Sequence, residues 1–378
     1  MVGPIWGKQT VFAAEASVPP SGQSIVGASP RPVVQAFFSP TASDDTRGTY
    51  HNLMRFLDTA QQSIHGSAHE VDMISVAEKL AQKAAEGVDV QIVVEARWWS
   101  LQKNTAARMV LEKSKVRIIP DTKKSGLQHN KFFVADGIRV WTGSTNLTET
   151  CLFYNPNNSL WIEDAEVAKN YQTEFNEQVA GGFGKKGSGA PNTPHPVVVN
   201  GDTKITTFFS PEDESLDHVV KLIQSARKSI DVMCFVFSSE EMTRALLEAH
   251  ARGVKIRVLL DNGFSSDGML SRWRFVPYRT LTQAGVECRY DDEKSKLHHK
   301  VIIVDGRSVL TGSMNLSTNG IKNNDENSII VDDAVVGRDF QEEFDRLWTY
   351  FQAGNHEIGP GEMTDSEMKA EMAAEAGQ

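Results

Sequence analysis

The chain has 378 residues, of which 40% are hydrophobic and 23% charged, and its formal net charge is -10 at pH 7. This composition is ordinary for a globular protein of about two domains, and it excludes collagen-like and wholly disordered chains. The acidic balance excludes a uniformly basic nucleic-acid-binding protein. The sequence has no run of about 18 apolar residues, so no transmembrane segment is expected.

Residues 1–30 read as a leader, for which two alternatives stay open. Ala14-Glu15-Ala16 fits a small-x-small cleavage site, which would make the leader an export signal. The segment before it contains Lys8 and Gln9 and is therefore a poor apolar h-region. A disordered leader of a protein in the cytoplasm, the default compartment, is the alternative. Cysteines without CxxC spacing predict neither a zinc ribbon nor a disulfide framework; they are Cys151, Cys234 and Cys288.

Residues 31–180 form a first predicted domain, and its chemistry-bearing residues lie near its end. His129-Asn-Lys131 is followed by Asp136, and Gly143-Ser144-Thr-Asn146 begins 14 residues after the histidine. A stretch rich in Gly and Pro, residues 181–203, then predicts a linker.

Residues 204–352 form a second domain that repeats the first, and an acidic tail, residues 353–378, follows it. Phe37-Phe38-Ser39-Pro40 recurs, for example, as Phe208-Phe209-Ser210-Pro211. Apolar strands between helices predict an α/β class with sheets buried on both faces. The elements expected in this half are a helix over 216–228, strands over 230–237 and 254–260, a capping box at Ser238-Ser-Glu-Glu241 that opens a helix to about Arg252, and a hairpin of 300–304 with 308–310 around Asp305-Gly306.

The second domain repeats the motif of the first. His298-His-Lys300 is followed by Asp305, and Gly312-Ser313-Met-Asn315 again begins 14 residues after the histidine. Residues two apart on a strand share a face, so each histidine and its lysine point into one pocket. Two such sets around one cleft would clamp a tetrahedral oxyanion such as phosphate. Two histidines allow one nucleophile and one general acid, and no metal is required by this set.

These motifs resemble the signature of the phospholipase D superfamily, H-x-K-x4-D followed by G-S-x-N, over roughly residues 33–351. The resemblance implies two similar phospholipase D-like α/β sandwich domains related by a pseudo-two-fold axis, with one active site between them. A monomer therefore suffices to build the site. It also implies a metal-independent, cofactor-free phosphodiesterase that forms a covalent phosphohistidine. The catalytic residues it implies are His129, His298, Lys131, Lys300, Asn146 and Asn315, with Ser144, Ser313, Asp136 and Asp305 as phosphate-binding or orienting residues.

The two halves differ at one informative position. Glu326 lies 28 residues after His298, and the matching residue of the first half is Asn157. If each contacts the histidine of its own half, Glu326 favours a cationic His298, because an opposite charge raises a histidine pKa. Asn157 would leave His129 neutral, and a neutral imidazole is the nucleophile. We therefore predict that His129 attacks phosphorus and that His298 protonates the leaving oxygen, and we count Glu326 as catalytic and Asn157 as phosphate-binding or orienting. A similar amide and carboxylate asymmetry in the tyrosyl-DNA phosphodiesterase branch implies the same assignment.

A second difference precedes the motifs. His69 and Glu70 stand in the first half where the second half has Phe235 and Val236. One alternative is that they lie near the cleft and support the residues that contact substrate. We favour the other, a loop-facing or satisfied polar pair, and do not count them as catalytic.

The motif does not identify which phosphodiester is the substrate, and three functional hypotheses remain open. The main prediction is a nuclease on DNA or RNA, because residues 312–327 resemble the small bacterial endonuclease branch. Residues 97–124 support it with a local net charge of +6, beside Trp98 and Trp99. A similar basic and aromatic mixture occurs over residues 272–279. The alternative is a phospholipase D or cardiolipin-type lipid hydrolase or phosphatidyl transferase, with peripheral membrane contact. The third, a non-catalytic binding module, is disfavoured by two complete motifs.

Overall fold

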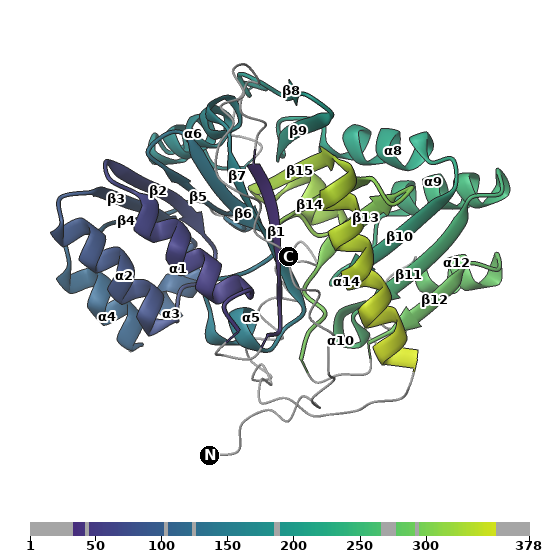
Figure 1. The fold of residues 1–378 in the computed structure, drawn as a ribbon, viewed down its shortest axis with the longest axis horizontal. Coiled ribbons are helices and arrows are strands. Elements are labelled where there is room, and N and C mark those ends of the chain that lie inside the picture. The colour runs from purple at the N-terminus through teal and green to yellow at the C-terminus, as the bar shows by residue number, and fades with distance from the viewer. Residues whose placement is uncertain are drawn as a thin grey trace, which may run out of the picture.

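The computed structural model describes residues 33–352, apart from 42–44, 102–104, 123–125, 185–189, 266–276 and 292–294. These residues form two mixed sheets with helices packed against them, one sheet from each half of the chain (Figure 1). The predicted α/β class is therefore confirmed.

The first sheet has seven strands in the order β1-β7-β6-β5-β2-β3-β4. Strands β2, β3 and β4 run parallel to one another, and the other pairs are antiparallel. The strands are β1 (Val33–Ser39), β2 (Ser63–Ala68), β3 (Asp89–Val94), β4 (Arg117–Pro120), β5 (Lys131–Ala135), β6 (Arg139–Gly143) and β7 (Asn157–Glu163).

The second sheet repeats this order as β9-β15-β14-β13-β10-β11-β12 and adds β8 at the outer edge of β9. Strand β8 lies inside the stretch 181–203 that composition predicts as a linker, so the second sheet begins within that stretch. The strands are β8 (Val197–Asn200), β9 (Thr203–Ser210), β10 (Ser229–Cys234), β11 (Lys255–Leu260), β12 (Glu287–Tyr290), β13 (Lys300–Val304), β14 (Ser308–Gly312) and β15 (Glu326–Asp332).

Helices cover both faces of each sheet. The described helices are α1 (Thr49–Thr59), α2 (Ile74–Ala85), α3 (Ala96–Leu101), α4 (Ala106–Lys113), α5 (Glu149–Phe153), α6 (Ala165–Val179), α8 (Ser215–Ser225), α9 (Glu240–Ala251), α10 (Asn262–Ser265), α12 (Pro277–Gln283), α13 (Thr318–Lys322) and α14 (Ala334–Gln352). The predicted capping box is displaced by one residue, because Ser239 rather than Ser238 caps α9 and accepts from the Met242 backbone N–H.

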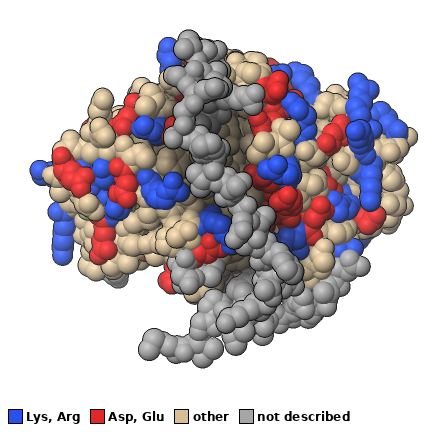
Figure 2. Space-filling view, viewed as in Figure 1, with Lys and Arg blue, Asp and Glu red and all other residues tan. Residues whose placement is uncertain are grey.

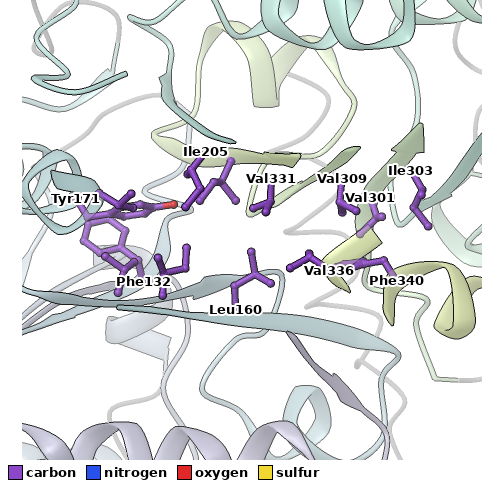
Figure 3. Close-up of a cluster of buried hydrophobic side chains, with 14 of the residues drawn as sticks. Phe132, Leu160, Tyr171, Ile205, Val301, Ile303, Val309, Val331, Val336 and Phe340 are labelled. Carbon is purple, nitrogen blue, oxygen red and sulfur yellow. The ribbon is translucent and has the colours of Figure 1, made fainter. Parts of the chain in front are cut away.

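The two halves share one hydrophobic core. Helices α6 and α14 lie between the sheets, where α6 contacts β9 and α14 contacts β1 of the opposite half. Figure 3 shows side chains of both halves facing one another in this layer. The labelled residues are Phe132, Leu160, Tyr171, Ile205, Val301, Ile303, Val309, Val331, Val336 and Phe340. Separate apolar clusters fill the outer faces, under α1, α2 and α4 in one half and under α8, α9 and α12 in the other.

Strand β5 shows why the motif strands read as continuous apolar runs. All five of its residues are buried. Phe132 and Val134 face the shared core, whereas Phe133 and Ala135 face the outer cluster. Alternate side chains of a strand point to opposite faces, so a strand covered on both faces is apolar throughout. The two motif histidines come just before the first residues of β5 and β13.

Candidate active site

The two motif histidines meet at the interface between the halves. His129 lies two residues before Lys131, where β5 begins, and His298 lies two residues before Lys300, where β13 begins. The His129 backbone N–H donates to the Asp325 carbonyl at 2.9 Å, and that of His298 donates to the Pro156 carbonyl at 2.9 Å. Each histidine is therefore fixed by backbone of the opposite half, next to the start of β15 or β7.

This crossing overturns the contact assumed in the sequence analysis. Glu326 does not contact His298 of its own half; its carboxylate oxygens lie 2.8 and 2.9 Å from Nδ1 of His129. Asn157 Oδ1 lies 2.8 Å from Nδ1 of His298. The pseudo-two-fold arrangement places the first residue of each of these strands against the histidine of the other half. The premise that Glu326 makes His298 cationic is therefore wrong.

The Glu326 carboxylate is fully buried and surrounded by donors. Besides His129 it accepts from the Ser313 hydroxyl at 2.6 Å and from Asn324 Nδ2 at 3.0 Å. Burial raises the pKa of Glu326 to about 7, and the nearby ammonium of Lys131 opposes this rise. The protonation of the Glu326 carboxyl is therefore coupled to that of the His129 imidazole that it touches.

The amide that faces His298 has a fixed orientation. Asn157 Nδ2 donates to the carbonyls of Cys151 and Asn155, at 3.2 and 3.3 Å. Its Oδ1 therefore turns to His298, and it also accepts from the Ser144 hydroxyl at 2.8 Å. An amide oxygen accepts but cannot donate, so Nδ1 of His298 carries the hydrogen and Nε2 is the remaining ring nitrogen for substrate.

The two predicted serines donate hydrogen bonds to the residues that face the motif histidines. Ser313 donates to Glu326, and Ser144 donates to Asn157. Their hydroxyls are buried in these contacts, which makes them orienting groups for the residues that face the imidazoles.

Both motif lysines are almost fully buried beside the histidines. Lys131 Nζ donates to the His129 carbonyl at 2.9 Å, and Lys300 Nζ donates to the His298 carbonyl at 3.0 Å. Burial lowers the pKa of Lys131 to about 8, although the Glu326 carboxylate counteracts this, and Lys300 lowers it further. Two cations that perturb each other in a buried site favour an anionic ligand.

The two motif asparagines follow β6 and β14 and are also buried. Asn146 Nδ2 lies 3.3 Å from Glu70 Oε2, and its Oδ1 has no partner among the described residues. Asn146 and Lys131 line one pocket of the first half, so an amide and an ammonium of one motif converge there.

The motif aspartates lie away from this cluster. Asp136 and Asp305 stand at the opposite ends of β5 and β13, in the turns of their hairpins, with φ of 54° and 55°. Asp136 accepts from the backbone N–H groups of residues 61–63 at 2.7–3.1 Å, and Asp305 accepts from those of residues 227–229 at 2.7–3.2 Å. In these positions they anchor the chain before β2 and β10.

The electrostatics of His298 follow from its surroundings. Burial lowers the pKa of His298 well below its usual value, and the cations of Lys300 and Lys131 lower it further. In the absence of a bound anion this imidazole is therefore neutral. An anionic ligand between the lysines would offset their effect and favour the protonated ring.

Two of the aromatic residues expected at a nucleic-acid groove are buried. Trp98 and Trp99 are 5% and 7% exposed, so neither ring can stack on a base as predicted. Arg108 lies over the Trp99 ring and pairs with Glu112 at 2.8 Å. Figure 2 shows Lys and Arg interspersed with Asp and Glu over both halves of the face in view. Some members of the two predicted basic stretches lie outside the described residues, namely Lys103, Lys123, Lys124 and residues 272–275.

His69 lies in the site, beside His129, although the sequence interpretation did not count it as catalytic. It is 2% exposed, and its ring lies 4.7 Å from that of His129, centroid to centroid. Glu70 Oε1 is 3.8 Å from its Nδ1, beyond hydrogen-bonding distance. The expectation of a satisfied polar pair is therefore wrong. The signal available in the sequence was the polar residue at the position that Phe235 occupies in the second half.

Two searches bear on ligands of the described residues. No group of three or more His, Cys, Asp or Glu side chains in the described ranges could hold a metal ion. Within the same ranges, no helix has both the length and the apolar character needed to cross a membrane.

Comparison with protein families gives matches in both halves. A family model described as "Cardiolipin synthase, PLD-like domain" matches residues 53–179 and 219–348, where PLD stands for phospholipase D. These two ranges contain every motif residue of the interface cluster.

Individual relatives match part of the chain. The mitochondrial cardiolipin hydrolase of Xenopus tropicalis is 35% identical over 148 residues, which are 39% of this chain and 68% of the relative. The human protein of the same name is 36% identical over 148 residues, 39% of this chain and 56% of its own. A phospholipase D of Rickettsia bellii (strain RML369-C) is 33% identical over 134 residues, 35% of this chain and 64% of its own.

Among solved structures, the phosphatidylserine synthase of Haemophilus influenzae Rd KW20 has a similar fold. Its TM-score is 0.60 at 15% identity, over 83% of this chain and 85% of that chain. At this identity the likeness concerns the fold, and it extends over both halves.

Proposed function

Because the chain belongs to the phospholipase D superfamily, it is a phosphodiesterase, and we propose that its substrate is an anionic phospholipid such as cardiolipin. The observation that carries the substrate is the 35% identity to a mitochondrial cardiolipin hydrolase, together with the match to a phospholipase D. These comparisons favour the lipid alternative over the nuclease that we predicted from the residues around the second motif.

We propose that the reaction proceeds in two steps at the interface cluster. Nε2 of His129 attacks phosphorus, the bond from phosphorus to the head-group oxygen breaks, and His298 gives that oxygen a proton. His298 then takes a proton from water, the water oxygen attacks phosphorus, and the phosphorus–nitrogen bond breaks to release phosphatidic acid. Histidine serves both as nucleophile and as acid–base group in such sites.

The Glu326 contact supports His129 as the nucleophile on a new basis. A carboxylate that accepts from Nδ1–H leaves the lone pair on Nε2 for attack. The imidazole becomes cationic once phosphorus is bound to Nε2 and hydrogen to Nδ1. The buried carboxylate of Glu326 then stabilises that charge at 2.8 Å, whereas the neutral amide of Asn157 offers His298 no such compensation.

The remaining residues suit binding of the transferred group. Lys131 and Lys300 place two buried ammonium groups beside the imidazoles. Asn146 and Asn315 would add amide donors to the two non-bridging oxygens, one from each half. Donors placed before the reaction at the site of developing charge lower the barrier without reorganisation.

The substrate is tested with purified protein in EDTA. Vesicles of cardiolipin or phosphatidylcholine are incubated in parallel with labelled single-stranded DNA and RNA, with His129→Ala and His298→Ala as controls. We expect phosphatidic acid from cardiolipin, lost in both variants. Intact lipid with cleaved nucleic acid would overturn the lipid proposal, and a requirement for added metal would contradict the histidine mechanism.

A nuclease is the second candidate, because Lys113, Lys115 and Arg117 are exposed basic residues of the first half. Such a nuclease should lose affinity steeply with salt, since phosphate contacts release counterions. A lipase should instead turn over faster on vesicles than on monomeric lipid.

The nucleophile is tested with a phosphodiester that has a p-nitrophenyl leaving group. This group leaves without a proton, so His298→Ala should still form the covalent enzyme, whereas His129→Ala should not. Labelling that survives in His129→Ala and disappears in His298→Ala would reverse the assignment.

A further inference from the structure

The site is not symmetric at the position that follows β2 and β10. His69 comes directly after β2, and Phe235 comes directly after β10. The Phe235 ring lies 5.0 Å from that of His298, and the His69 ring lies 4.7 Å from that of His129. The position packs a ring against the catalytic imidazole in both halves, and a phenyl group performs this packing in the second.

The imidazole of His69 is buried, but its polar atoms make no hydrogen bond that would explain a polar ring at this position. Neither ring nitrogen has a hydrogen-bond partner among the described residues, although both are inaccessible to solvent. Buried polar groups are normally hydrogen-bonded, and those that are not call for an explanation such as a missing ligand. A phenyl ring would fill the same place without an unpaired donor and acceptor.

The surroundings of His69 are those of an anion-binding pocket. It lines the same pocket as Lys131 and Asn146, the two predicted phosphate ligands of the first half. Burial holds the pKa of His69 well below its usual value, and the positive charges of His129, Lys131, Lys300 and Lys296 add to this. The ring is therefore neutral and offers one N–H donor and one acceptor.

We propose that His69 is a further catalytic residue, which donates a ring N–H to a non-bridging oxygen of the phosphodiester bound at His129. The inference rests on the proposed phosphodiesterase site and adds to it a donor that the second half lacks. Lys131 and Asn146 have counterparts in Lys300 and Asn315, whereas His69 has none. One non-bridging oxygen would therefore receive a donor that the other lacks. The contact would strengthen as charge develops on the phosphoryl oxygens in the transition state.

The test uses a short-chain phosphatidyl-p-nitrophenol and its two phosphorothioate diastereomers, each with sulfur at one non-bridging oxygen. Wild type is compared with His69→Phe, which reproduces the ring of the second half. We expect kcat/KM on the oxygen substrate to fall by about 100–1,000-fold, the loss typical for one donor to a developing oxyanion. The ratio of rates for the two diastereomers should change by at least about fivefold, because sulfur accepts a hydrogen bond from nitrogen poorly.

Two further variants identify the donating nitrogen. His69→Gln places an amide nitrogen near the position of Nε2, and His69→Asn places one near that of Nδ1. One of them should partly restore both the rate and the diastereomer ratio. Restoration by neither, with the ratio in His69→Phe equal to that of wild type, would overturn the contact.

His65→Phe is the matched control, since it is the same substitution four residues earlier, within β2. His65 stacks on Phe175 at 4.8 Å and bonds Gln172 and Asp89, away from the motif residues. Its diastereomer ratio should equal that of wild type. His69→Phe should melt no lower than wild type, because no internal hydrogen bond is lost. A lower melting temperature, with activity reduced equally on both diastereomers, would assign His69 a structural role and refute the proposal.

The same measurements separate this inference from the proposed lipid substrate. If wild type ignores the phosphatidyl substrate but cleaves a nucleoside p-nitrophenyl phosphorothioate, the lipid proposal fails. The diastereomer ratio of that nucleotide in wild type and in His69→Phe still decides the role of His69.

Discussion

Replacement of Glu326 by glutamine is the most direct test of the contact that crosses the interface. Three donors converge on the carboxylate, from His129 at 2.8 Å, Ser313 at 2.6 Å and Asn324 at 3.0 Å. Glutamine has one acceptor oxygen and an NH2 group, so at least one of these donors then faces another donor. The cationic phosphohistidine also loses its counter-charge.

The expected magnitude follows from the hydrogen bonds that change. A hydrogen bond to a charged group contributes about 1.5–3 kcal/mol. Since about 1.4 kcal/mol corresponds to a tenfold rate, Glu326→Gln should slow formation of the covalent enzyme by about 10–150-fold. Stopped-flow measurement of the p-nitrophenolate burst reads this step separately from hydrolysis. An unchanged burst rate, with only the later steady rate reduced, would refute the role given to Glu326.

A carboxylate transplant distinguishes charge from mere disruption. Asn157→Asp is isosteric, and Asn157 Oδ1 already lies 2.8 Å from His298 Nδ1. In the double variant Asn157→Asp/Glu326→Gln the carboxylate faces His298 and an amide faces His129. If the carboxylate selects the nucleophile, the covalent label should move from His129 to His298, which peptide mass spectrometry detects. A label that stays on His129 would show that another feature selects it.

Three further predictions concern the groups around the imidazoles. Burial holds the pKa of Lys131 near 8, so its charge is lost as pH rises through that value; kcat/KM should fall above about pH 8, and Lys131→Arg should move this limb to higher pH. Ser313→Ala removes a donor to a carboxylate and Ser144→Ala one to a neutral amide, so the first should cost about 1.5–3 kcal/mol in activation free energy and the second about 0.5–1.5 kcal/mol, measured as kcat. Asp136→Ala leaves backbone donors unpaired far from the imidazoles; urea unfolding should show a loss of about 1–3 kcal/mol, with turnover per folded molecule unchanged.

Much of the architecture could be predicted from the sequence because duplication makes the spacing informative. The matched distance from histidine to glycine aligned the halves, and with them Asn157 and Glu326 at the starts of β7 and β15. The partner of each was predicted wrongly, because spacing records position within a half and the contact lies across a pseudo-two-fold interface. Ser144 and Ser313 donate within their own halves, to Asn157 and Glu326, and these acceptors became evident only in the structure because motif spacing does not record side-chain contacts.

Residues at the rim were harder to interpret, because burial is a tertiary property. Trp98 and Trp99 follow a strand and stand in a basic stretch, a composition that suits a nucleic-acid groove. The fold packs both rings inward instead. Strand β8 illustrates the converse, since Val197–Asn200 is a short apolar run in a Gly- and Pro-rich stretch and gains its stability from pairing with β9.

The two departures from pseudo-symmetry meet at one histidine, and this predicts the behaviour of a symmetrised site. Glu326 reaches His129 across the interface, and His69 packs against it from its own half, whereas His298 meets Asn157 and Phe235. In the double variant His69→Phe/Glu326→Gln both imidazoles are flanked by an amide and a phenyl ring. If these two residues select the nucleophile, the p-nitrophenyl substrate should label both histidines weakly and to similar extents. Strong labelling confined to His129 would refute this reasoning, because the selection would then come from elsewhere in the cleft.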